Sequence, residues 1–371
     1  TTTGTIDAAN NNTGVGVDVF AALTTGDHNT VVGFSAGLAN TTGTNNTFIG
    51  SLSGDANSTG NNNVSVGKSS LSANTTGSSG TAVGKSALGA NTTGAQNTAV
   101  GESCLATNTT GASNTAVGYV ALFANTTGAN NVAVGANTLQ PNTTGASNTA
   151  IGKGALASNT TASNNTAVGF ESLVANTTGS SSTAVGRNSL TSCTTGQRNM
   201  AFGDSALQDV TTGVENTGIG NNAFGSVTTN NHNIGIGQSA GNHSVAANGA
   251  KNICIGNYTD IPTTDTNTSI VIGYDVTGVG TDNFTFGRQS VDSNIAFGAT
   301  SITAPSDVRL KEDIQDEQIG LSFINELRPV TFRWKKEKDI PSEMNSYKAD
   351  SELRVMNGKY NHGFIAQEVK E

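Results

Sequence analysis

Residues 97–113 read NTAVGESCLATNTTGAS, and residues 114–130 read NTAVGYVALFANTTGAN. The two segments align without a gap, and the same pattern extends in both directions. A Gly preceded by an apolar residue recurs every 17 residues, at Gly16, Gly33, Gly50, Gly67, Gly84, Gly101, Gly118, Gly135, Gly152, Gly169, Gly186, Gly203, Gly220 and Gly237. Fourteen glycines in constant register indicate a structural repeat, because a disordered low-complexity segment has no reason to keep such spacing.

The columns of the repeat have distinct chemistry. An apolar residue such as Val100 precedes the Gly, Ala99 lies two before it, and Leu105 lies four after it. Asn108 lies seven after it and opens an Asn-Thr-Thr-Gly segment. Val, Ile and Thr favour strands, whereas Asn and Gly favour turns. We therefore expect an all-β protein, a parallel β-solenoid or β-roll in which each coil holds two short strands and two turns and neighbouring coils lie ~4.8 Å apart.

The repeat also predicts an oligomer. A coil with one Val and one Leu has a thin core, and the Ala and Gly columns would leave flat faces for close packing. Bundled chains bury more surface per coil, so we expect a homo-oligomer and take a homotrimer as its form. The Asn column, to which Asn74, Asn91 and Asn108 belong, could form an inward hydrogen-bonded ladder.

Composition excludes several classes of protein. The chain has 371 residues, of which only 12% are charged and 5% aromatic, with a net charge of −9. Residues 1–305 carry 7 Lys and Arg against 14 Asp and Glu, so they offer no basic stripe for nucleic acid. No run approaches the ~20 apolar residues of a membrane span, so we expect no membrane insertion. The absence of an initiating Met indicates that the chain starts further upstream.

No cofactor or metal site is expected. The four histidines are scattered, and Gly14-Val15-Gly16 lacks the third Gly and the context of a nucleotide loop. Cys104, Cys193 and Cys254 each fall in a column of the repeat, without metal-binding spacing, and are interpreted as small buried apolar residues.

The segment Asn114-Thr115-Ala116-Val117-Gly118, followed by Ala121-Leu122, resembles the head repeats of trimeric autotransporter adhesins. It resembles repeats of phage tail-fibre proteins still more closely. The resemblance covers residues 14–240, after a lead-in at 1–13. Later apolar-Gly pairs fall at uneven intervals, so residues 241–305 are interpreted as an irregular cap or neck, and as a receptor-binding tip.

The composition changes abruptly at residue 306. Ser306-Asp307-Val308-Arg309-Leu310-Lys311 opens a charged α+β segment, in which Ile319, Phe323, Ile324 and Leu327 share a helical face that ends at Pro329. Residues 327–332 and 363–369 follow as two further blocks. The three blocks together resemble the intramolecular chaperone of endosialidase family, also classed as a self-cleaving serine peptidase. The resemblance covers residues 306–371 and ends before the family's later helical part.

The resemblance implies a trimerising domain that helps the upstream fibre to fold and then cuts itself off before its first Ser. The scissile bond would be Pro305–Ser306, with Ser306 as nucleophile and Lys311 as its base. An extended strand would separate these two residues by roughly 16 Å, so a bend or a second chain must bring them together. The alternative is that Ser306 caps a turn and Lys311 is solvated.

A need for such a chaperone also follows from the repeat. Identical coils in several chains can align in registers that differ by one coil and are nearly equal in stability. A C-terminal trimeriser would set the register first.

These features favour a structural fibre that attaches a virion to its host. The expected location is the virion tail fibre, outside the cell. The expected partners are two further copies, other tail proteins and a host cell-surface receptor, either a glycan or an outer-membrane protein. The alternative is a bacterial trimeric adhesin on the cell surface. An ice-binding solenoid, based on Thr92-Thr93 and its equivalents, ranks behind these, as does a glycan-degrading tailspike, because Glu102 and Glu171 are isolated.

Overall fold

The computed structural model describes residues 5–7, 11–242, 249–262, 266–289, 291–299, 330–342, 347–353 and 361–363. The chain divides into two compact units, Thr1–Pro305 and Ser306–Glu371. Their boundary coincides with the change in composition at residue 306. Each unit is described separately below.

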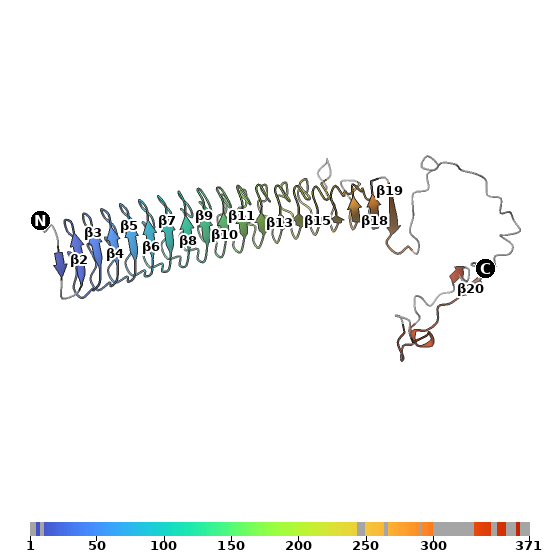
Figure 1. The fold of residues 1–371 in the computed structure, drawn as a ribbon, viewed down its shortest axis with the longest axis horizontal. Coiled ribbons are helices and arrows are strands. Elements are labelled where there is room, and N and C mark those ends of the chain that lie inside the picture. The colour runs from blue at the N-terminus through green and yellow to red at the C-terminus, as the bar shows by residue number, and fades with distance from the viewer. Residues whose placement is uncertain are drawn as a thin grey trace. The chain divides into compact units, whose positions relative to one another are not determined.

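The first unit is a stack of coils, each with one short strand on the same wall (Figure 1). The strands that stack in parallel are β2 (Asn12–Val15), β3 (Thr30–Val32), β4 (Thr47–Ile49), β5 (Val64–Val66), β6 (Thr81–Val83), β7 (Thr98–Val100), β8 (Thr115–Val117), β9 (Val132–Val134), β10 (Thr149–Ile151), β11 (Thr166–Val168), β12 (Thr183–Val185), β13 (Met200–Phe202), β14 (Thr217–Ile219), β15 (Ile234–Ile236), β16 (Ile253–Ile255), β17 (Ile270–Tyr274) and β18 (Asn283–Arg288). Equivalent residues pair, as Thr98 does with Thr115 and Ala99 with Ala116. The predicted all-β parallel solenoid is confirmed.

The parallel ladder extends beyond the strict 17-residue spacing. Ile234, Ile253, Ile270 and Phe284 pair in succession, so the intervals become 19, 17 and 14 residues. Residue 240 therefore marks the end of regular spacing and not the end of the ladder. At the two ends, β1 (Thr5–Asp7) pairs antiparallel with β2, and β19 (Val291–Ala296) pairs antiparallel with β18. A reversed strand interrupts the parallel template on which further coils would stack.

Each coil contains one strand, and the expectation of two was wrong. The second apolar segment forms turns because alternate residues there adopt left-handed backbone. Ser103 and Leu105, for example, have φ angles of 54° and 51°. Such angles are unfavourable for a branched residue, but Leu105 is fully buried, and its packing offsets the strain.

The coil interior is lined by Ala and Leu, not by Val and Leu. Ala99 and Leu105 are fully buried, whereas Val100 and Val117 are 36% exposed. The expectation that the Ala column forms an outer packing face was therefore wrong. A three-residue strand with a Thr-Ala-Val sequence can direct only its middle residue inward, and the narrow coil leaves room there for a methyl group.

Two Asn ladders cross-link the coils internally. In the predicted ladder, the Asn108 amide donates to Asn91 Oδ1 at 2.8 Å and to the Gly111 carbonyl at 2.9 Å. In the second ladder, the Asn97 amide donates to the same Gly111 carbonyl at 2.8 Å, and Asn97 Oδ1 accepts the Asn114 backbone N–H. Both ladders are buried, so their hydrogen bonds replace water completely.

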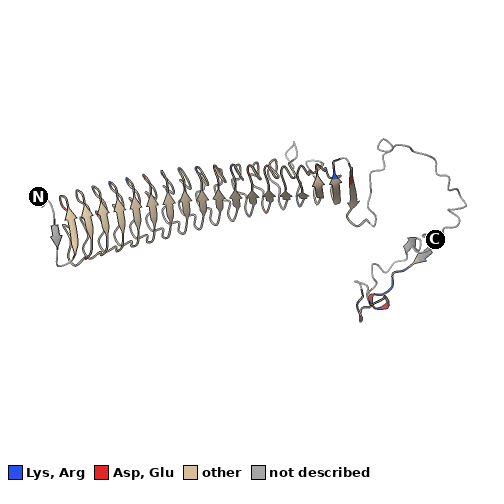
Figure 2. Ribbon diagram, in the orientation of Figure 1, with Lys and Arg blue, Asp and Glu red and all other residues tan. Residues whose placement is uncertain are grey.

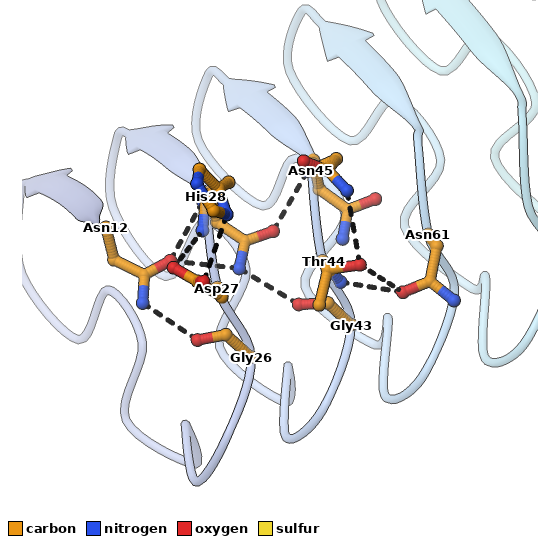
Figure 3. A network of polar contacts seen from close by, with 10 residues as sticks. Asn12, Gly26, Asp27, His28, Gly43, Thr44, Asn45 and Asn61 are labelled. Carbon is orange, nitrogen blue, oxygen red and sulfur yellow. Dashed lines mark hydrogen bonds and ion pairs between the residues drawn. The ribbon is translucent and has the colours of Figure 1, made fainter. Parts of the chain in front are cut away.

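Figure 3 shows this arrangement in the first coils, where the Asn12 amide points to the Gly26 carbonyl. The next coil repeats the contact, with the Asn29 amide donating to the Gly43 carbonyl. The Asn108 and Asn91 contacts confirm the predicted inward Asn ladder, and the Asn that precedes most strands forms the further ladder seen in Figure 3.

The repeating Gly is required by close approach of the backbone. Gly101 has a φ of 138°, and a Cβ built there would lie 2.4 Å from the Gly118 carbonyl oxygen of the next coil. Neither the dihedral nor the distance permits a side chain. The coil spacing therefore dictates Gly at this corner.

We predict that Asn108→Ala lowers the free energy of unfolding by about 3 kcal/mol, because it removes two donors and leaves the Asn91 oxygen without a partner. Urea denaturation followed by circular dichroism measures the change, and hydrogen exchange locates it to neighbouring coils. Asn221→Ala, at an exposed Asn, is the matched control and should cost under about 0.5 kcal/mol. Equal effects of the two substitutions would contradict the buried ladder.

Gly101→Ala should destabilise the solenoid by at least about 2 kcal/mol, since its Cβ meets backbone in a left-handed conformation. Gly89→Ala is the control, because its nearest contact is 3.2 Å away and the next coil carries Ala106 at the same position. The two thermal midpoints should differ clearly. A stable Gly101→Ala protein would show that neighbouring coils are not packed this closely.

Candidate functional site

The three cysteines of the solenoid lie in its interior. Cys104, Cys193 and Cys254 are free and buried, as the sequence predicted. Burial raises the pKa of the Cys104 thiol to about 12 and that of Cys193 to about 11. Burial also raises the pKa of Cys254, and the negative charge of Asp260 adds to the effect. Thiols that stay protonated at neutral pH are neither nucleophiles nor metal ligands.

The described ranges, from residue 5 to residue 363 with their gaps, contain no group of three His, Cys, Asp or Glu residues that could hold a metal ion. Within the same ranges, no helix has the length and apolar character needed to cross a membrane.

Charged residues lie at the coil corners, and the strands from β2 to β17 carry none (Figure 2). Several pair with the equivalent residue of the next coil. Lys85 lies 3.2 Å from Glu102, and Arg187 lies 2.7 Å from Asp204. The Arg187 guanidinium lowers the pKa of Asp204 by hydrogen bonding and charge. Exposed pairs of this kind contribute little stability, but they favour the alignment of neighbouring coils.

Two exposed tyrosines lie against each other near the C-terminal end of the ladder. The rings of Tyr258 and Tyr274 lie 6.2 Å apart and nearly perpendicular. The two side chains come from adjacent coils, and they are 45% and 46% exposed. Exposed tyrosines combine an apolar face with a hydroxyl, a combination that suits recognition of sugars and proteins.

The second unit contains a small antiparallel pair, β20 (Val330–Phe332) with β21 (Asn361–Gly363). The Phe332 and Trp334 rings pack edge to face, 5.4 Å apart. A single 3₁₀ turn, Glu337–Asp339, follows. Lys336 and Lys338 both pair with Glu352 and hold the pKa of its carboxyl at about 2.

Comparison with known protein families finds a match for this second unit. Residues 306–371 match the family model of the chaperone of endosialidase. No curated protein matches the chain. The chain therefore carries a 17-residue-repeat β-solenoid followed by a C-terminal chaperone-of-endosialidase domain, the combination that the sequence motifs predict.

The predicted cleavage residues lie outside the described part of the chain. Pro305, Ser306 and Lys311 all fall between residues 300 and 329, as does the predicted helix that ends at Pro329. Of the block at 363–369, only Gly363 is described. The roles of Ser306 and Lys311 remain predictions from the family resemblance.

One feature of the surface was missed at the sequence level. Residues such as Val100 and Val117 were assigned to the core because they are apolar and always precede Gly. The signal that would have corrected this is the small residue that most coils carry between Thr and Val. An outward position tolerates any size, whereas Ala, Gly, Ser and Cys repeat at the middle position in most coils.

We predict that the native chain does not react with Ellman's reagent at pH 8 and that all three thiols react after denaturation in guanidinium chloride. Rapid reaction of one thiol in the native protein would place it at the surface. Each exposed thiol adds one equivalent of released chromophore.

Buried thiols also predict a pH dependence. The Cys104 pKa is 9.0 in the unfolded reference and about 12 in the folded chain, so the folded state holds the proton longer. Stability should fall as the pH rises from 9 towards 12. Cys104→Ala, a residue already present at the equivalent Ala121, should weaken this dependence. An unchanged slope would mean that Cys104 does not titrate with unfolding.

Proposed function

We propose that this chain is the shaft of a homotrimeric fibre that attaches a virion to its host cell. The observation that carries the proposal is the order of the two units. A long parallel solenoid of near-identical coils is followed directly by a segment that matches the chaperone of endosialidase. A fibre made of identical repeats is the kind of protein that needs an external device to set register.

The physical argument concerns slippage between chains. Within one chain, each coil continues covalently into the next, so its register is fixed. Between chains, a shift by one coil places Thr against Thr and Val against Val again, and costs only the contacts at the two ends. A domain that brings three C-termini together before the coils stack removes these alternatives.

The proposal includes self-cleavage between Pro305 and Ser306. The Ser306 hydroxyl would attack the Pro305 carbonyl and pass its proton to Lys311, provided that burial keeps the Lys311 amine neutral. The peptide bond would break as Lys311 returns the proton to the Ser306 nitrogen, and water would then hydrolyse the ester that links Pro305 to the Ser306 oxygen. Cleavage would separate the shaft from its chaperone and make assembly irreversible. The support is the family match and the position of Ser306 as its first residue.

The C-terminal end of the shaft is the proposed receptor-binding region. After cleavage, residues 241–305 would form one end of the fibre. They combine uneven coil lengths with the exposed Tyr258 and Tyr274 pair. Variable segments on a rigid scaffold are where binding residues generally lie.

A bacterial trimeric adhesin remains the second candidate, because it would use the same solenoid. An ice-binding surface is disfavoured by the Thr-Thr turns. The Thr92 hydroxyl donates to the Thr109 carbonyl at 3.0 Å, and Thr109 repeats the contact with Thr126. One of the two hydroxyls in each turn is thus engaged within the solenoid and is not presented as a regular array.

We predict that recombinant chain yields a trimer of shafts that end at Pro305 and that Ser306→Ala leaves the chains uncut. Intact-mass spectrometry with light scattering measures both properties. Ser301→Ala, five residues upstream, is the matched control and should be cut normally. A wild-type trimer that stays uncut would contradict self-cleavage and leave the C-terminal domain as a permanent part of the trimer. A soluble monomer would contradict the fibre.

For attachment, purified shafts should compete with the virion for adsorption to its host. Tyr258→Ala with Tyr274→Ala should weaken this competition about tenfold, the equivalent of ~1.4 kcal/mol of lost contact. Tyr119→Ala removes an exposed tyrosine from a distant coil and should have no effect. Equal competition by all variants would place the receptor site elsewhere.

A further inference from the structure

The outward positions of the strand wall form a continuous uncharged surface. In every strand from β2 to β17, the two residues that flank the buried middle position point outward and align from coil to coil. We call these two columns the outward stripe. Thr fills most of the first column, and Val or Ile fills most of the second.

The Val and Ile column of this stripe is apolar and accessible in the single chain. Val117 is 36% exposed, Ile151 40% and Phe202 53%. Sixteen strands at ~4.8 Å spacing and ~10 Å width give a surface about 70 Å long and about 700 Å² in area. About half of this area is apolar, because Thr fills most of the first column. A continuous row of exposed Val and Ile of this length is unusual on a monomeric protein, which indicates an interface.

Columns that contain charged residues border the stripe on both sides. The column after the Gly corner includes Lys85, Glu102 and Arg187 among apolar residues such as Phe34, and the column two residues before the strand includes Arg198 and Glu215. An apolar centre with a charged rim is the usual anatomy of a protein–protein interface. Figure 2 shows the same division, with tan strands and charges confined to the coil edges.

We propose that the outward stripe is the surface through which copies of this chain pack, parallel and in register, around a common axis. The inference rests on the proposed trimer and specifies which face each copy turns inward. The outward stripe takes the place of the Ala column as the expected packing face, because each coil buries its own Ala.

The regular spacing of the stripe indicates that its binding partner is a second copy of this chain. Its rows repeat at the spacing of stacked parallel strands, without a break over sixteen coils. A parallel second copy presents the same rows at the same spacing, so every Val row meets a Val row. The area, about 700 Å² per copy, is close to the ~800 Å² per partner of standard stable interfaces.

Disulfide trapping tests this arrangement in the full chain. Because the native cysteines are buried, any interchain disulfide should form at the introduced cysteines. Thr115→Cys and Val117→Cys occupy the two outward positions of β8, and Thr110→Cys lies in an exposed turn outside the stripe. After mild oxidation, at least one of the β8 variants should form an interchain disulfide, since matched rows around an axis bring Cα atoms within ~7 Å.

Thr110→Cys should stay uncrosslinked. The equivalent pair in β10, Thr149→Cys and Ile151→Cys, repeats the test in a distant coil if a β8 variant fails to fold. Trimers without cross-links at either strand would overturn the stripe interface while leaving the proposed trimer intact. Cross-linking at Thr110→Cys alone would assign the interface to the turn side. A monomeric wild-type chain would remove the trimer itself.

Discussion

The structure depends on the backbone hydrogen bonds that join each coil to the next at a separation of about 17 residues. These bonds are not confined to the strands. They continue through the turns, as from Leu105 N–H to the Ala121 carbonyl and from Thr109 N–H to the Thr126 carbonyl. Because nearly the whole circumference is paired, the coils cannot separate locally without exposing buried polar groups. Gly at the corner, Ala at the middle of the strand and Asn at two buried positions are the residues that permit this spacing.

The same constraint explains why the chain presents an apolar outer wall. The coil interior is too narrow for more than one large side chain, so Leu occupies it and the β-branched residues of the strand face outward. A chain with this pattern has satisfied its polar groups internally but has left Val and Ile at the surface. In the proposed trimer, association of several copies would cover that surface, and a C-terminal chaperone would set their alignment. The repeat, the outer stripe and the chaperone match thus belong to one account of a fibre.

The coil length and the parallel register could be predicted from the spacing of Gly16 to Gly237, because a solenoid transfers sequence period directly into structure. The inward Asn108 ladder was also predictable, since Asn recurs where a turn needs it. Hydrophobicity did not predict the side on which Val100 lies, because alternation over only three residues places Ala and Val on opposite faces and both are apolar. The size restriction at the Ala99 column was the signal that distinguished the two faces. The left-handed backbone at Leu105 has no sequence signal, since Leu is among the residues least expected there. Continuation of the ladder to β18 was hidden by the change in coil length.

The most direct test of the whole account is an electron cryomicroscopy reconstruction of the assembled shaft, at a resolution that separates individual coils. The account predicts layers spaced ~4.8 Å apart along the axis, with one 17-residue coil from each of three chains in every layer. The outward stripes should meet at the centre, and the charged corners should face solvent. A single chain per layer, or a stripe of Val and Ile facing solvent, would contradict it.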